Sequence, residues 1–79
     1  MTRTLLLYHT LGCHLCESAE QLVAPLAAER GWQVESKEIS GDDALIARYG
    51  VRIPVLHDPR TGRELGWPFD AGDVLALLR

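Results

Sequence analysis

Two cysteines, Cys13 and Cys16, are the residues of this chain whose types and spacing point most clearly to chemistry. They lie between an apolar run, Leu5 to Tyr8, and a segment with helical periodicity that starts at Leu15. Unpaired N–H groups and the dipole at a helix N-terminus favour negative charge, so we expect a lowered pKa for the Cys13 thiol. Cys16 lies one turn further in, where it can close a disulfide. This arrangement predicts thiol–disulfide exchange in which Cys13 attacks and Cys16 resolves the mixed disulfide.

Three other interpretations of the cysteine pair stay open. A purely structural disulfide is uncommon in a reducing compartment. A zinc site needs four ligands, yet the chain has no second Cys-x-x-Cys, and His9, His14 and His57 do not follow a recognised ligand spacing. A [2Fe–2S] cluster shared between two chains is compatible with two thiolates from each.

Composition limits what kind of protein carries this pair. The chain has 79 residues, of which 47% are hydrophobic and 24% charged, so residues 1–79 are predicted to form a single globular domain. A net charge of -3 and dispersed basic residues argue against nucleic acid as a partner. The N-terminal apolar run is too short for a signal peptide or a membrane span. We therefore expect a cytoplasmic protein that does not bind membranes.

The elements that must position the cysteines follow from periodicity and from turn residues. Leu5–Tyr8 is expected to be a buried strand. The next segment is expected to be a helix that ends at Gly31 and is kinked or shortened by Pro25. Its predicted core face comprises Leu15, Ala19, Leu22, Val23, Leu26 and Ala27.

The rest of the chain is predicted to contain a strand that begins at Trp32 and is closed by Ile39, and then a short helix. Ser40 and Asp43 resemble a capping box for that helix, which ends at Gly50. A strand over 52–56, a turn over 58–62 and a returning strand over 63–66 form a predicted hairpin. Asp70 and Asp73 cap a last helix with core residues Val74, Leu77 and Leu78. The order β-α-β-α-β-β-α predicts an α/β fold with a mixed four-stranded sheet flanked by helices.

The segment Gly12-Cys13-His14-Leu15-Cys16, with Arg52-Ile53-Pro54-Val55-Leu56 later in the chain, resembles glutaredoxin-like proteins of the thioredoxin superfamily. The likeness is greatest to a small bacterial group with a Gly-Cys-His-Leu-Cys motif, and it covers nearly the whole chain. Two features depart from the family pattern. His14-Leu15 has no proline between the cysteines, and Gly66-Trp67-Pro68-Phe69 replaces the expected Gly-Gly turn.

The resemblance implies a thioredoxin/glutaredoxin-like fold and a role for several residues. Pro54 matches the cis-proline that faces the cysteine pair, and Ile53 would pair its backbone with the substrate. Arg52 is the candidate residue for binding a carboxylate of the substrate. Gly12 and His14 border the same substrate-binding site.

The implied function is a thiol–disulfide oxidoreductase that reduces protein or glutathione mixed disulfides. Its partners are then a disulfide-containing protein or glutathione. Glutathione would act as a co-substrate, with no metal and no tightly bound cofactor. The alternative is a non-enzymatic [2Fe–2S]-binding or redox adaptor module of the same fold.

Overall fold

The computed structural model describes residues 3–79, which form a four-stranded sheet and three helices. In chain order the elements are β1 (Arg3–His9), α1 (His14–Glu29), β2 (Trp32–Glu38), α2 (Asp43–Tyr49), β3 (Val55–His57), β4 (Glu64–Gly66) and α3 (Ala71–Leu77). The predicted order and α/β class are confirmed.

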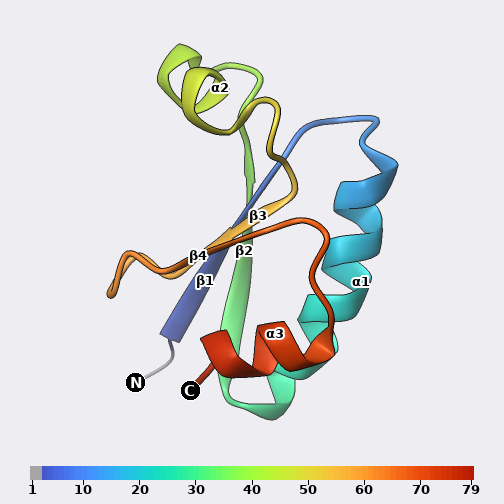
Figure 1. Cartoon of the computed structure of the whole chain (residues 1–79), viewed down its shortest axis with the longest axis vertical. Coiled ribbons are helices and arrows are strands. Elements are labelled where there is room, and N and C mark those ends of the chain that lie inside the picture. Colours follow the sequence, from blue (N-terminus) through green and yellow to red (C-terminus); the bar gives the residue numbers. More distant parts are fainter. Residues whose placement is uncertain (1–2) are drawn as a thin grey trace.

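The sheet is mixed, as predicted, with the strand order β2-β1-β3-β4 (Figure 1). β1 runs parallel to β2, and the crossover between them is α1. β3 is antiparallel to both of its neighbours, with Leu56 opposite Leu7 of β1 and Leu65 of β4. β1 is therefore a central strand, and the cysteines follow directly from its C-terminal end.

The side chains of β1 alternate between two hydrophobic clusters, one on each face of the sheet. Leu5 and Leu7 pack with α1 and α3, and Leu6 and Tyr8 pack with the cluster that contains Tyr49 of α2. A strand buried on both faces has to be apolar throughout, which explains the continuous run from Leu5 to Tyr8. Helices α1 and α3 lie on one face of the sheet, and α2 covers the end of the other (Figure 1).

The buried face of α1 is rotated from the one that the sequence predicts. Its buried residues are Cys16, Ala19, Val23 and Ala27. Leu15, expected in the core, is 52% exposed, because the buried stripe includes its neighbour Cys16 and leaves Leu15 at the side of the helix. The prediction for Leu15 is therefore wrong, and the position of Cys16 in the stripe explains its burial.

Pro25 neither ends nor visibly shortens α1, contrary to expectation. The helix continues to Glu29, and Gly31 follows with a φ of +77°. Proline removes one N–H donor, and the carbonyl that loses its partner belongs to Gln21. Both Gln21 and Pro25 are exposed, so water can satisfy this carbonyl.

The N-cap of helix α2 lies two residues after the predicted cap, Ser40. Asp42 is the N-cap, and its Oδ1 accepts a hydrogen bond from the Leu45 N–H at 3.1 Å. The backbone N–H of Ser40 instead donates to Glu38 Oε1 at 2.8 Å. The predicted Ser40–Asp43 capping box is therefore wrong, because Asp42 supplies the carboxylate that the first turn needs.

The third strand begins later than predicted. It starts at Val55, because the N–H groups of Arg52 and Ile53 both donate to the Tyr49 carbonyl, at 2.7 and 3.0 Å. These bonds close the end of α2 and leave residues 52–54 outside the β-ladder. The hairpin that follows and the last helix agree with prediction, including a reciprocal capping box between Asp70 and Asp73.

No helix within residues 3–79 is long and apolar enough to cross a membrane.

Candidate active site

Cys13 is placed at the N-cap of α1 by a tight turn after β1. Its N–H donates to the Thr10 carbonyl at 3.3 Å, and Gly12 has a φ of +78°. A residue with a Cβ adopts this left-handed conformation only with strain, so glycine is the residue suited to the turn. Cys13 itself is extended, with φ −86° and ψ 103°, which is typical of an N-cap.

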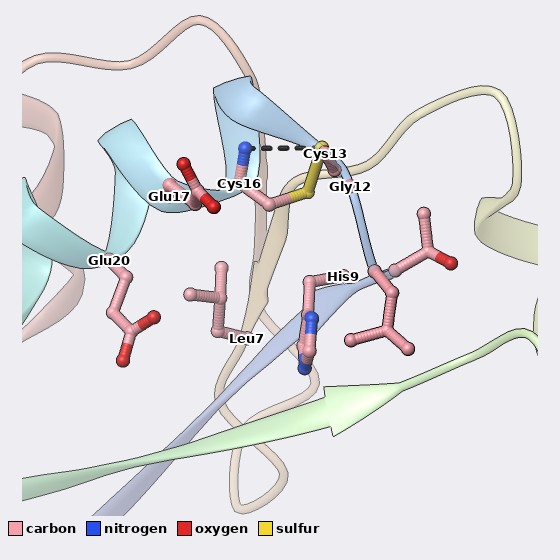
Figure 2. A pocket seen from close by; sticks show the side chains of 9 residues that line it. Leu7, His9, Gly12, Cys13, Cys16, Glu17 and Glu20 are labelled. Carbon is pink, nitrogen blue, oxygen red and sulfur yellow. Dashed lines mark hydrogen bonds between the residues drawn. A yellow bond between two sulfur atoms is a disulfide. The ribbon is translucent and has the colours of Figure 1, made fainter.

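Cys13 and Cys16 are joined by a disulfide, with their Cα atoms 5.3 Å apart. The Cys16 N–H donates to Cys13 Sγ at 3.1 Å, so the sulfur occupies the capping position that a serine or aspartate oxygen usually fills (Figure 2). Cys13 is half-buried, whereas Cys16 is only 4% exposed. The two cysteines therefore differ in access to a partner.

A pocket of about 200 Å³ lies beside the disulfide between β1 and α1. Figure 2 shows Leu7 and His9 on the strand side, with Glu17 and Glu20 on the helix side. The lining residues are Leu7, His9, Thr10, Leu11, Gly12, Cys13, Cys16, Glu17 and Glu20. An open pocket against a sulfur–sulfur bond can admit a partner thiol or disulfide to the reacting atoms.

Ile53 and Pro54 lie at the same end of the sheet as the cysteine-bearing turn. Val55 pairs with Tyr8, so the residues before it continue toward His9 and the turn that follows it. Pro54 is buried, its carbonyl accepts the Trp67 N–H at 3.1 Å, and the Ile53–Pro54 peptide bond is cis. Neither residue lines the pocket. Their part in substrate binding stays a prediction.

Comparison with known proteins identifies the family. The model for the Glutaredoxin-like domain (DUF836) matches residues 4–79. The chain belongs to this glutaredoxin-like family.

Two solved structures are similar to this glutaredoxin-like chain. A structural-genomics target protein from X. campestris, determined by X-ray, is 47% identical, with a TM-score of 0.78 over 94% of this chain and 93% of that one. A protein from Nitrosomonas europaea, solved by NMR in solution, is 30% identical, with a TM-score of 0.84 over 100% of this chain and 94% of that one. No curated protein matches the sequence.

Two predicted site residues of the glutaredoxin-like chain lie away from the pocket. Arg52 pairs with Glu64, with its Nη2 3.4 Å from Oε1, and its guanidinium lies 5.5 Å from the centre of the Tyr49 ring. His14 has a 96% exposed side chain whose Nδ1 lies 3.6 Å from Oε2 of Glu17. Of the residues predicted for substrate binding, only Gly12 lines the pocket with the cysteines.

The pocket also contains residues that the sequence did not single out: His9, Thr10, Leu11, Glu17 and Glu20. A usable signal was present for the two glutamates. Each lies four residues after a cysteine on a predicted helix, so each falls on the same side of that helix as its cysteine. No comparable signal marks His9, whose position depends on the strand pairing.

Glu38 lies next to this pocket in the β-ladder, where it pairs with His9. The hydrogen bond from the Ser40 backbone N–H lowers the pKa of Glu38 below its ordinary value. Within residues 3–79, no three His, Cys, Asp or Glu side chains are grouped so that they could hold a metal ion.

Proposed function

We propose that this glutaredoxin-like chain is a dithiol oxidoreductase that reduces disulfides of proteins or mixed disulfides with glutathione. One observation carries the proposal: Cys13 and Cys16 form a disulfide at a helix N-terminus, with Cys13 half-buried and Cys16 buried. The family match supports redox chemistry in the same fold.

The proposed reaction begins with the reduced protein. The Cys13 thiolate attacks one sulfur of the partner disulfide, forms a mixed disulfide and releases one partner thiolate, which takes up a proton. The Cys16 thiol then loses its proton, and the thiolate attacks Cys13 Sγ and closes the Cys13–Cys16 disulfide. The second partner thiolate leaves and takes up a proton. Two electrons pass from the dithiol to the partner, and a thiol reductant regenerates the dithiol.

The chain's own groups support the first step. The Cys16 N–H donates to Cys13 Sγ, and this bond together with the dipole at the helix N-terminus would stabilise negative charge on the sulfur. Burial of Cys16 keeps it from competing for the partner until the mixed disulfide brings Cys13 Sγ within reach. A cytoplasmic location is part of the proposal, since the dithiol form needs reducing conditions.

The test compares two single-cysteine variants as a matched pair. The substrate is a protein that carries a mixed disulfide between one of its cysteines and glutathione. With this substrate, the reduced Cys16→Ser variant is expected to accumulate a mixed disulfide at Cys13 that mass spectrometry detects. Cys13→Ser is expected to form none and to lose disulfide reduction by at least about 100-fold, since the buried Cys16 cannot replace the nucleophile. Equal activity of Cys13→Ser and the wild type would contradict the proposal.

Visible absorption spectroscopy distinguishes the proposed reductase from a protein that binds an iron–sulfur cluster. Protein purified anaerobically is expected to lack visible absorption and iron while retaining disulfide reduction. A stoichiometric [2Fe–2S] spectrum in a protein without reductase activity would assign the cysteines to a cluster instead.

A further inference from the structure

The pocket beside the disulfide is lined by acidic side chains and by no Lys or Arg. Glu17 and Glu20 extend from the first two turns of α1, and Figure 2 shows both carboxylates on the helix side of the space next to the disulfide. His9 supplies the one ionisable nitrogen of the lining. A partner that reaches Cys13 through this pocket therefore meets negative charge.

Within residues 3–79, neither carboxylate forms an ion pair with a Lys or Arg. The ion-pair partner of Glu17 is His14, at 3.6 Å, and an imidazole is charged only when protonated. In the part of the chain that the structure describes, 3–79, Glu20 takes part in no ion pair. Two glutamates and no Lys or Arg give the lining of the pocket a net negative formal charge.

Arg52, the residue predicted to bind a substrate carboxylate, already interacts with other side chains. Arg52 pairs with Glu64 and stacks over Tyr49, in the cluster on the α2 side of the sheet. The pocket thus offers no guanidinium to the two carboxylates of each glutathione unit. An anionic disulfide meets repulsion there without compensation.

Two exposed leucines lie close in sequence to the cysteines. Leu11 lines the pocket and is 84% exposed, and Leu15, the residue before Cys16 in the first turn of α1, is 52% exposed. Large apolar side chains left in water beside a reactive centre are typical of a surface that a protein partner covers. A small disulfide does not bury them.

We propose that the pocket selects a protein segment whose disulfide cysteine is flanked by Lys or Arg, and that it disfavours glutathione disulfide. The inference rests on the proposed function and specifies its substrate. Glu17 and Glu20 attract the basic side chains of the segment, and Leu11 and Leu15 contact its apolar ones. The exchange is the one written above: the dithiol loses two electrons and the disulfide of the segment gains them.

The experiment measures second-order rate constants for oxidation of the reduced protein by disulfides of opposite charge. One arm uses the disulfide dimers of two end-blocked peptides, Lys-Leu-Cys-Lys and Glu-Leu-Cys-Glu. The other uses cystamine, a dication, and dithiodipropionate, a dianion. Each reaction is quenched in acid, and the remaining thiols are counted after alkylation.

The ratio of the cationic to the anionic rate constant is then compared between protein variants, which removes differences in intrinsic reactivity between the disulfides. In Glu17→Gln/Glu20→Gln we expect this ratio to fall by about tenfold at low salt. In the wild type we expect 0.5 M salt to lower this ratio as well, because these charges are exposed to solvent and are screened.

The matched control is Glu29→Gln/Glu35→Gln, which changes the net charge equally at exposed positions outside the pocket. It should retain the ratio of the wild type. Equal ratios in the pocket variant and the wild type would overturn the inference, and so would a charge effect confined to the small disulfides. Failure of every disulfide to oxidise the dithiol would instead contradict the proposed function itself.

Discussion

The different environments of the two sulfurs arise from neighbouring residues. Gly12 turns the chain so that Cys13 becomes the N-cap, and the helical repeat then carries Cys16 into the stripe of Ala19 and Val23. Cys13 is therefore accessible at a helix N-terminus, and Cys16 is buried one turn later. The proposed division of labour follows from this placement.

At this scale, Gly12→Ala tests whether the turn sets the reactivity of Cys13. No atom lies within 4 Å of a Cβ added at Gly12, so the cost is backbone strain alone. We expect the free energy of unfolding to fall by about 1 kcal/mol. Because relief of this strain displaces Cys13, single-turnover disulfide exchange should slow severalfold.

Gly31→Ala is the matched control for that experiment. Gly31 has nearly the same φ, +77°, and equally open surroundings, but it follows the far end of α1. Denaturant unfolding should show a similar loss of stability, with an unchanged exchange rate. An exchange rate equally slow in both variants would mean that lost stability, and not the turn, causes the effect.

Among the elements, α2 is joined to the sheet by a stack of aromatic rings and a partly buried hydrogen bond. The rings of Tyr8 and Tyr49 are stacked with their centres 4.2 Å apart. The Tyr49 hydroxyl donates to Glu64 Oε2 at 2.5 Å, and the Tyr8 hydroxyl lies 3.0 Å from Nδ1 of His57. Burial raises the pKa of Tyr49 to about 12, and the hydrogen bond from Tyr49 lowers that of Glu64.

Tyr49→Phe should reveal this bond through the pH dependence of stability. A carboxyl group with a lowered pKa in the folded state stabilises the protein above its ordinary pKa, and this contribution is lost as the pH falls. We expect the variant to be less stable by about 2 kcal/mol at pH 7, with a difference that shrinks toward pH 3. Urea unfolding across this range measures it.

Tyr8→Phe is the control, because its hydroxyl contacts an imidazole and no carboxylate. Its free energy of unfolding should change between pH 7 and pH 3 in the same way as that of the wild type. A Tyr49→Phe difference that stays constant from pH 7 to pH 3 would show that Glu64 is not stabilised by this bond.

For the molecule as a whole, two clusters on opposite faces of one small sheet hold the site in place. β1 contributes to both, and the turn at its end carries Cys13. Leu56 of β3, opposite Leu7, is fully buried in the larger cluster. Since a domain of this size has a small stability, a single cavity removes much of it.

Leu56→Ala is therefore expected to cost about 3 kcal/mol, measured as the shift in the denaturant midpoint. Leu15→Ala removes the same atoms from an exposed position and should change stability by less than about 0.5 kcal/mol. A large loss of stability in Leu15→Ala would show that Leu15 is buried in the core, as its helical spacing suggested.

Sequence alone determined the order of elements, the mixed sheet, the turn at Gly62, the Asp70–Asp73 cap and the cysteine pair. Each of these depends on neighbours in the chain: on periodicity, on turn residues, and on the separation of three residues that places Cys16 one turn after Cys13. The element boundaries predicted at Ser40 and at residues 52–54 were wrong. They depended on which of several nearby acceptors forms a hydrogen bond with a free backbone N–H group.

Tertiary structure decided what surrounds Cys13 and Cys16. The helix packs with Cys16 inward and Leu15 outward, and pairing with Glu64 holds Arg52 away from the pocket. The same packing brings His9 of β1 beside Glu17 and Glu20 of α1. Such contacts join residues from different elements, so they follow from the docking of helix against sheet, which local patterns do not specify.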